Sequence, residues 1–528
     1  SSLSAEFESH KKGFKENRKN FFTGIRGIYD ECEGSDCAPN VVAAEWFTYR
    51  KRGLLSPFGV GTIDQALMAV LQTKHVFVRL FGLAHKTIII DEVHAYDAYM
   101  SALLERLLEW LAALGSPVIL LSATLPKNRR NTLINAYQRG LGITESETVG
   151  NDEYPRISYA TGEQIKVRHI ETSAKQQTLH IKKIGENFVE DLKEKLAGGG
   201  CVAVICNTVG RSQEIYRLLS SDDFFADKID LLHSRFRFGD RDRIEKRVLE
   251  KFGSKPDENG ECPNRPPTAV LIATQIIEQS LDIDFDLMIS DLAPIDLLLQ
   301  RIGRLFRHER IRPPVLNVPE LWLIEPEFDE QGIPDFKNSL VYDDHILLRT
   351  WLELNKEQYK KIEIPVEIEK LIEAVYDFAK TPENLDESLS AFWQTTLERC
   401  LESLEADDDS AKNRIIKRPS YSSHISGIFT NNLEEDSPEI HQSLQAVTRL
   451  TEPTASVICL WQKDDKIFSD ETFTEEIDLD KKPSSSQANK LLRNSLSVSN
   501  KAVVFKFLAE DVPKGWQESA LLRRHRVI

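Results

Sequence analysis

The alternation of short apolar runs with helical periods over residues 54–142 is the feature that most constrains the fold of this chain. The runs TIII (87–90) and PVILLS (117–122) are too short for helices and rich in β-branched residues, which is typical of central strands in a covered parallel sheet. Between them, the leucines of SALLERLLEWLAALG recur at helical spacing, and Gly115 can end the helix in the left-handed conformation. The stretch therefore predicts a strand–helix–strand unit with a right-handed crossover.

A second series of apolar runs follows, and helical segments separate its earlier members. It consists of CVAVICN (201–207), DLLHS (230–234), TAVLIAT (268–274), LMISD (287–291) and LWLIEP (321–326). Residues 145–158 are polar and typical of a linker, residues 342–405 are amphipathic and helical, and the tail after 447 holds one strand-like run, SVICLW. We therefore predict an α/β protein in four parts: a first sheet domain (1–150), a second sheet domain (151–341), a helical linker (342–420) and a C-terminal domain (421–528).

Charge and cysteine content narrow the function classes. The 528 residues include 83 acidic and 67 basic ones, a formal net charge of −16, which excludes nucleic-acid binding by bulk charge and leaves only local basic patches. Seven cysteines, a sparse and odd number, argue against a disulfide framework and for a reducing compartment. No apolar stretch is long enough to span a membrane, so we expect a cytoplasmic protein with no membrane partner.

The tetrapeptide Asp91-Glu92-Val93-His94 directly follows the first apolar run. Carboxylates at the carboxyl end of a buried parallel strand lie where α/β folds bind ligands. There the first carboxylate can hold Mg²⁺ on a nucleotide, and the second can activate the attacking water. The alternative is that both acids simply open the next helix, where they favour the helix dipole.

Ser122-Ala123-Thr124 ends the second apolar run. Its two hydroxyls could bond to His94 and the acidic pair and relay the nucleotide state to a partner surface. The alternative is ordinary hydroxyl turn chemistry at a strand end.

The string Gln300-Arg301-Ile302-Gly303-Arg304-Leu305-Phe306-Arg307 is the third signal. Arg304 and Arg307 would share one face if the segment is helical, and both could then reach a phosphate. Arginine suits that task because its planar fork stays charged and binds oxyanions through two donors. The alternative is a solvated basic helix end.

In this order the three motifs resemble those of superfamily 2 DExH helicases. More closely, the chain resembles the carboxyl-terminal motor part of the helicase–nuclease of type I CRISPR systems, over RKRGLLSPFGVGTIDQAL, KTIIIDEVHAYDAYMSALLERLLEWL, LLSATLP and ATQIIEQSLDIDFDLMISDLAPIDLLLQRIGRLFRH. The resemblance extends more weakly to the carboxyl end. It implies two RecA-like domains, the first incomplete at its amino terminus, a helical linker and a small C-terminal domain.

The resemblance also implies roles for individual residues. Asp91 would bind Mg²⁺ and Glu92 would be the catalytic base of ATP hydrolysis. Residues that couple the ATP site to the nucleic-acid groove would be His94, Ser122 and Thr124. Residues that face the phosphates would be Gln300, Arg304 and Arg307, the two arginines acting as fingers. Asp282 would contact the ribose, and Arg301 belongs with it to the expected nucleotide-binding set. Expected contacts to the nucleic-acid backbone are Thr62, Thr208, Ser234, Arg235 and Thr274, although a Thr or Ser after a strand is more often a cap.

The implied function is an ATP-dependent single-stranded DNA translocase, the helicase part of a type I CRISPR interference effector. It would unwind target DNA after R-loop recognition, with a Cascade-type surveillance complex as partner. Alternatives are a non-catalytic docking or DNA-binding fragment of that effector, and an unrelated superfamily 2 RNA helicase. The intact acidic pair and arginines favour the motor over the docking fragment.

Two parts of the family pattern are missing from these residues. No Gly-Lys-Thr or Gly-Lys-Ser phosphate loop occurs, and no His-Asp cluster for a metal-dependent nuclease. We therefore expect a further amino-terminal segment to carry both, to cover the open edge of the first sheet, and to be required for ATP hydrolysis.

Overall fold

The computed structural model describes residues 53–72, 76–123, 125–143, 154–161, 164–171, 176–253, 263–278, 281–336, 341–383, 385–420, 448–450, 454–519 and 521–528. The chain divides into two compact units. The first comprises Ser1–Leu121, Asn135–Ser146 and Ser410–Leu450, and the second comprises Ser122–Ile134, Glu147–Asp409 and Thr451–Ile528.

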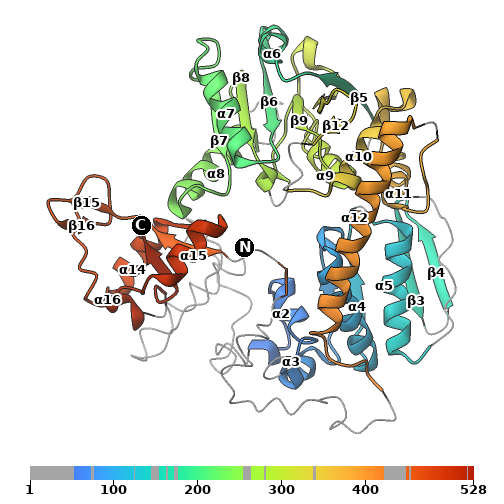
Figure 1. Cartoon of the computed structure of the whole chain (residues 1–528), viewed down its shortest axis with the longest axis horizontal. Helices are drawn as coiled ribbons and strands as arrows, with labels where there is room; N and C mark the ends of the chain where they lie inside the picture. The colour runs from blue at the N-terminus through green and yellow to red at the C-terminus, as the bar shows by residue number, and fades with distance from the viewer. Residues whose placement is uncertain are drawn as a thin grey trace. The chain divides into compact units, whose positions relative to one another are not determined.

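The first unit holds the predicted strand–helix–strand arrangement, whose helix α4 is labelled in Figure 1. Strand β1 (Ile88–Ile90) pairs in parallel with β2 (Val118–Leu120), and helix α4 (Ala98–Ala113) connects them. The predicted leucine stripe of α4 is buried, and Gly115 has a φ of +66°, the left-handed conformation expected after the helix. The predicted strands, the helix between them and the left-handed glycine are confirmed.

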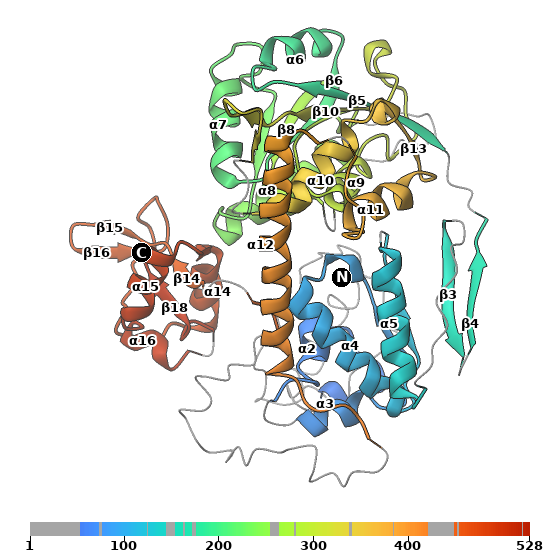
Figure 2. The same cartoon turned by 45° about the vertical axis from the view of Figure 1, so that its right-hand side comes forward.

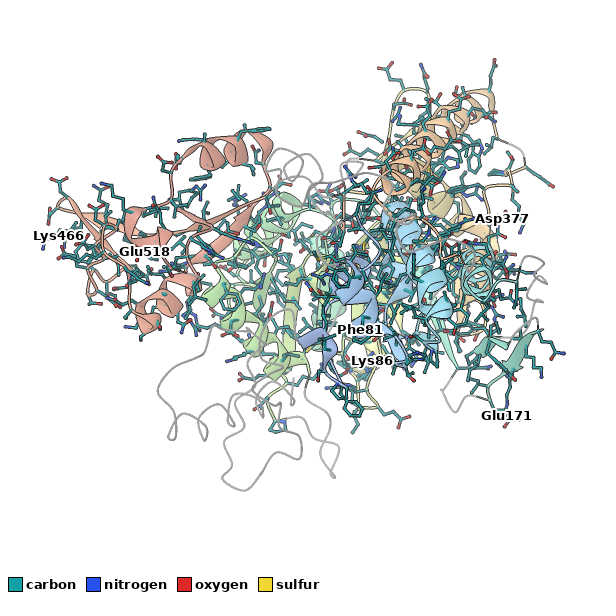
Figure 3. All side chains as sticks on the ribbon, turned by 90° about the horizontal axis from the view of Figure 1, so that it is seen from below. Phe81, Lys86, Glu171, Asp377, Lys466 and Glu518 are labelled. Carbon is teal, nitrogen blue, oxygen red and sulfur yellow. The ribbon has the colours of Figure 1, made fainter. Side chains whose placement is uncertain are left out.

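Shorter elements complete this unit: η2 (Gly53–Leu55), α2 (Ile63–Leu67), α3 (Val76–Leu83) and the end of α5 (Lys127–Gly140). Lys86, labelled in Figure 3, donates through Nζ to the carbonyls of Leu54 (2.9 Å) and Ser56 (2.6 Å) and so holds η2 in place. A distant segment also belongs here, because the indole of Trp110 on α4 donates to the carbonyl of Lys417 at 3.0 Å.

The second unit contains a seven-stranded sheet. In sheet order its strands are β13 (Lys361–Ile364), β5 (Gln177–Ile184), β10 (Glu320–Ile324), β9 (Leu287–Asp291), β6 (Gly200–Ile205), β8 (Thr268–Ala273) and β7 (Ile229–Leu232). All pairs are parallel except that of β13 with β5. Strands β6 and β9 are buried along their whole length, as central strands should be. The five strands predicted here are confirmed, as is the α/β class.

Helices cover both faces of this sheet (Figure 2). Alternate residues of β6 enter two separate apolar clusters, one on each face. On one face lie α6 (Val189–Leu196) and α7 (Val209–Ser220). On the other lie α8 (Phe238–Phe252), α9 (Ile295–Ile302), α10 (Asp344–Leu354), α11 (Ile368–Tyr376) and the start of α12 (Glu387–Lys412).

Two sequence-based predictions of secondary structure were partly wrong. The predicted linker runs into a hairpin of β3 (Arg156–Thr161) and β4 (Gln164–His169). The predicted helical stretch 342–405 includes β13, whose sequence KIEI alternates apolar and charged residues and pairs at the edge of the sheet. Its helical neighbours concealed that two-residue period.

The carboxyl-terminal part of the second unit has its own small core. Strand β14 (Ala455–Ile458) lies between β17 (Ser495–Val498) and β18 (His525–Val527). Around it are hairpin β15 (Trp461–Lys463) with β16 (Lys466–Phe468), and helices α14 (Ser485–Arg493), α15 (Lys501–Ala509) and α16 (Lys514–Gln517). Elsewhere in the second unit, after β10, lies a further hairpin of β11 (Glu327–Phe328) with β12 (Pro334–Asp335). Within the described ranges, no helix combines the length and apolar character needed to cross a membrane.

Candidate nucleotide and DNA site

The acidic pair stands at the carboxyl end of β1 and does not open helix α4. Asp91 and Glu92 are both exposed, and the backbone amide of Glu92 donates to the Asp91 carboxylate at 2.9 Å. Helix α4 begins later and is capped by Asp97, whose carboxylate accepts from the amide of Met100 at 2.7 Å. Asp97 therefore fills the capping role that was the alternative explanation for the acidic pair.

A buried histidine faces the second carboxylate. Glu92 has a left-handed backbone (φ 55°, ψ 41°) and precedes the short turn η3 (Val93–Ala95). The His94 side chain is 3% exposed, and its Nε2 lies 3.1 Å from Oε2 of Glu92. Because Val93 is buried and bonds through its amide to the carbonyl of Leu121 (3.2 Å), the turn is anchored to the strand pair.

Tyr96 supports the same turn. Its hydroxyl donates to the carbonyl oxygen of Asp91 at 3.2 Å. Burial, reinforced by the carboxylates of Asp64, Asp91 and Glu92, raises the pKa of Tyr96 to about 12, although Arg449 opposes the shift. The phenol is therefore a permanent donor at neutral pH.

The expected DNA contact Thr62 precedes helix α2, is exposed and makes no capping bond. Asp64, two residues further on, was not predicted as part of the site. Its carboxylate accepts from Oγ1 of Thr448 (2.7 Å) and from Arg449 (3.2 and 3.3 Å). Burial opposes the shift, but these bonds lower the pKa of the Asp64 carboxyl. Nothing in the sequence indicated the pair of Asp64 and Arg449, because the two residues lie 385 positions apart.

The predicted coupling residues are only partly described. Ser122 is half-buried and directly follows Leu121, whose amide donates to the carbonyl of Ile90 at 2.8 Å. Thr124 lies outside the described residues.

In the second unit, the expected arginine fingers do not share a helical face. Helix α9 ends at Ile302 with Gly303 as its C-cap, so that both arginines lie in the following turns. Arg304 is half-buried and donates to the carbonyls of Ile277 (3.3 Å) and Glu278 (2.9 Å). The condition for a shared helical face is therefore not met, because the helix ends before Arg304.

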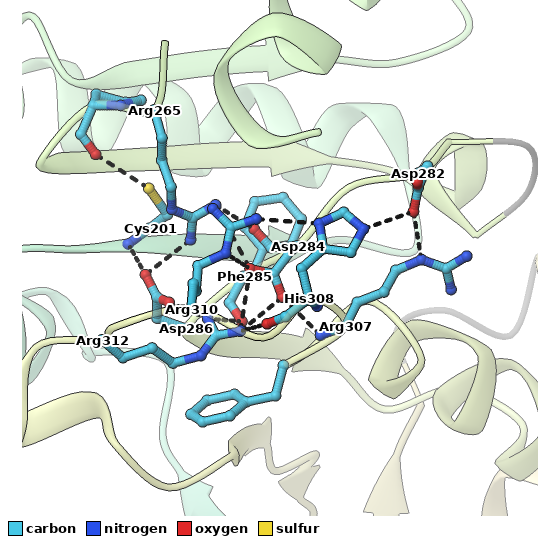
Figure 4. Close-up of polar contacts among 12 residues, drawn as sticks. Cys201, Arg265, Asp282, Asp284, Phe285, Asp286, Arg307, His308, Arg310 and Arg312 are labelled. Carbon is cyan, nitrogen blue, oxygen red and sulfur yellow. Dashed lines mark hydrogen bonds and ion pairs between the residues drawn. The ribbon is translucent and has the colours of Figure 1, made fainter. Parts of the chain in front are cut away.

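Arg307 binds the residue expected to contact the ribose (Figure 4). Its Nε donates to Oδ1 of Asp282 at 2.6 Å, and the two side chains are 40% and 48% exposed. The same oxygen lies 3.1 Å from Nε2 of His308. The Arg307 bond lowers the pKa of the Asp282 carboxyl, with His308 adding to the effect.

A buried ion cluster underlies this pair and was not predicted (Figure 4). Asp284 is fully buried and meets Arg310 at 2.7 Å and Arg312 at 2.9 Å. It also accepts from the backbone amides of Arg307 (2.7 Å) and His308 (3.2 Å). The cluster therefore fixes the loop that carries Arg307, and a cavity of about 420 Å³ opens beside it.

Arg301, expected among the nucleotide-binding residues, lies inside the protein. It is 0% exposed and bonds to Glu278, Ser290, Asp291, Asn207 and Tyr342. Arg301 therefore holds the motif against the sheet. Its neighbour Gln300 differs, because its Nε2 is buried with no hydrogen-bond partner within the described part of the chain.

The expected DNA contacts of the second unit converge on one sheet edge. Thr208 follows β6, Ser234 and Arg235 follow β7, and Thr274 follows β8, which pairs in parallel with both other strands. Ser234 and Arg235 are exposed, whereas Thr274 is 3% exposed. Thr208 does cap helix α7, accepting from the amide of Arg211 at 3.2 Å, as the alternative explanation held.

Comparison with known proteins gives one family. Family models described as "CRISPR-associated nuclease/helicase Cas3, C-terminal" and "Cas3 C-terminal domain" match residues 198–310 and 449–528. The endonuclease/helicase Cas3 of Thermus thermophilus is 34% identical, over 94% of this chain and 56% of the relative. The nuclease/helicase Cas3 of Streptococcus thermophilus is 41% identical, over 72% of this chain and 40% of the relative. The chain thus spans about half the length of these relatives.

Solved structures agree. T. fusca Cas3 matches with a TM-score of 0.80 and 33% identity, over 93% of this chain and 56% of that one. The structure named T. fusca Cas3-ATP matches with a TM-score of 0.79 and 32% identity, over 92% and 56%. A chain of a "CRISPR RNA-guided surveillance complex, pre-nicking" matches with a TM-score of 0.71 and 32% identity, over 91% and 58%. The resemblance to Cas3 proteins recognised from the motifs is confirmed, and the chain corresponds to their carboxyl-terminal part.

Proposed function

We propose that this chain is the motor part of an ATP-dependent helicase that moves along single-stranded DNA and unwinds target DNA in type I CRISPR interference after R-loop recognition. The observation that carries the proposal is the Glu92 carboxylate, which stands clear of helix α4 and 3.1 Å from a buried histidine. A carboxylate held in this way can orient and activate the water that attacks a γ-phosphate.

The side chains fit ATP with Mg²⁺. Magnesium at nucleotide sites commonly uses one or two carboxylates together with the phosphates, and Asp91 is an exposed carboxylate directly after β1. Gln300, whose Nε2 has no hydrogen-bond partner among the described residues, Arg304 and Arg307 all carry N–H donors, and such donors suit phosphate oxygens. Bound Mg²⁺ would neutralise charge that develops on the phosphates.

Arg307 has to exchange partners to act as a finger. It now binds Asp282 in a half-exposed pair, and such pairs are worth at most about 1 kcal/mol. A γ-phosphate offers more negative charge than one carboxylate and can therefore take Arg307 over. Loss of the phosphate on hydrolysis returns Arg307 to Asp282, which supplies the reversible step that a motor needs.

DNA would lie along the sheet edge formed by the ends of β6, β8 and β7. Hydroxyl and guanidinium groups of Thr208, Ser234 and Arg235 suit contacts to phosphate oxygens. Thr62, in the first unit, is a separate expected contact to the nucleic-acid backbone. Contacts of this kind position a strand without reading its sequence.

The motor is expected to need a further amino-terminal portion. The chain has no phosphate loop, and the β1–β2 pair exposes apolar side chains: Ile89 is 63%, Ile119 45% and Leu121 46% exposed. Parallel sheets are normally covered on both faces, so we expect the portion of Cas3 relatives beyond this chain to complete the sheet and supply the loop and the nuclease. The surveillance-complex neighbour supports a Cascade-type partner.

Steady-state ATP hydrolysis tests the proposal. The full chain is assayed with and without single-stranded DNA, alone and with the amino-terminal portion of the Streptococcus thermophilus relative added. We expect DNA-stimulated turnover that Glu92→Gln abolishes and Glu190→Gln retains, since Glu190 is an 83% exposed carboxylate on α6. Turnover that survives Glu92→Gln contradicts the proposal. DNA binding without turnover in either form favours the docking fragment, and stimulation by RNA in place of DNA favours the RNA helicase.

A further inference from the structure

The buried guanidinium of Arg301 is fully satisfied. Arginine has five N–H donors, and each has an acceptor here. Nε donates to Oε1 of Glu278 (2.7 Å) and Nη1 to Oγ of Ser290 (2.8 Å) and the carbonyl of Asp291 (3.3 Å). Nη2 donates to Oδ1 of Asn207 (3.1 Å) and to the hydroxyl of Tyr342 (3.2 Å).

These acceptors belong to the segments that would meet DNA and ATP. Asn207 directly precedes the expected DNA contact Thr208 at the end of β6. Glu278 ends the turn that begins at Thr274, and its backbone carbonyl accepts from Nη2 of Arg304 at 2.9 Å. One residue, Glu278, therefore binds Arg301 through its side chain and the ATP-facing arginine through its backbone.

Tyr342 closes the network from outside every helicase motif. Its hydroxyl accepts from Nη2 of Arg301 and, at 3.1 Å, from Nε2 of Gln275, the residue after Thr274. The same Gln275 amide donates to the carbonyl of Asn207 at 2.7 Å. The next residue, Asp343, caps helix α10, so the backbone at Tyr342 is fixed by the packed helix behind it.

We propose that Tyr342 is a positioning residue. Its hydroxyl links the turn at Gln275, which would face DNA, to Arg301 and, through Glu278, to Arg304. DNA binding at this edge would therefore change the position of the Arg304 guanidinium, which is expected to face ATP. The inference rests on the proposed function and adds the route by which the two sites communicate within the second unit. Burial raises the pKa of the Tyr342 phenol, so the link stays protonated through the physiological range.

Tyr342→Phe removes the hydroxyl and keeps the ring. Tyr359→Phe is the matched control, because Tyr359 is 1% exposed in the same unit and lies outside the network, in η6 (Glu357–Lys360). Amide hydrogen exchange of the full chain is followed at residues 275–278 and 303–306, with and without a single-stranded oligonucleotide. Both segments contain hydrogen-bonded amides, and the measurement needs no ATP turnover.

In the wild type and in Tyr359→Phe, DNA should slow exchange in both segments. In Tyr342→Phe, slowing at 275–278 should remain while slowing at 303–306 falls by roughly 2- to 30-fold, the usual range for one coupling residue. A purely structural role would instead alter both segments in the absence of DNA. Equal slowing in Tyr342→Phe and wild type, or slowing confined to 275–278 in the wild type, overturns the inference and leaves the proposed function standing. No slowing anywhere in the wild type refutes DNA binding, and the inference with it.

Discussion

Asp282 and Asp284 give a matched test of the arginine cluster, because the same substitution two residues apart should have very different effects. Asp284 is fully buried and pairs with Arg310 and Arg312, whose side chains are 4% and 5% exposed. Asp284→Asn replaces one acceptor oxygen with a donor that faces these cations. Removing one member of a buried ion cluster costs about 3–5 kcal/mol. Asp282→Asn breaks a pair that is 40% and 48% exposed and should cost at most about 1 kcal/mol.

Urea unfolding followed by tryptophan fluorescence measures both losses, since Trp322 is buried in strand β10 of the same sheet. With a slope of about 2 kcal/mol per molar, Asp284→Asn should lower the midpoint by about 1.5–2.5 M and Asp282→Asn by at most about 0.5 M. Equal shifts for the two variants would refute the assignment of Asp284 as the buried anchor of the loop that carries Arg307.

Further predictions concern the first unit. His94→Ala should lower the kcat of DNA-stimulated ATP hydrolysis by up to about 10²-fold with little change in the KM for ATP, because it frees the Glu92 carboxylate; a change confined to KM would count against this role. Tyr96 should titrate near pH 12 in the difference between wild-type and Tyr96→Phe absorbance spectra. Because the raised pKa belongs to the folded chain, the contribution of Tyr96 to stability is complete below about pH 10 and lost as the pH rises through 12. A Tyr96 phenol that titrates near pH 10 would contradict this prediction. Gly140→Ala should destabilise this unit by about 1–3 kcal/mol in urea unfolding, because a Cβ there would lie 2.1 Å from the carbonyl oxygen of Glu109. An unchanged unfolding midpoint would contradict this prediction and show that helices α4 and α5 can move apart without cost.

The motif order and the apolar runs made most of the fold predictable. Strands β6 and β8 are nearly continuous apolar runs and β9 begins with one, and that pattern placed them. Strand β5 was missed because QTLHIKKI mixes charged with apolar residues beside the edge strand β13. Only Leu179 and Ile184 of strand β5 are buried, so its apolar pattern is weak in the sequence.

The candidate site was predictable as a set of residue types and less so as geometry. Asp91 and Glu92 follow their strand as expected, whereas Arg301 is buried although its motif neighbours Arg304 and Arg307 are not. A motif records which residues occur together and not which of them face solvent. Tyr342 belongs to no motif, and only its hydrogen bond with Arg301 places it in this network.

Strand displacement tests the central claim most directly. A duplex with a 3′ single-stranded tail is incubated with ATP, Mg²⁺ and the full chain supplied with the amino-terminal portion of a Cas3 relative. We expect ATP-dependent release of the annealed strand by the wild type and by Glu190→Gln, and none by Glu92→Gln. Release that is independent of ATP, or equal in Glu92→Gln and wild type, would contradict the account of this chain as an ATP-driven motor.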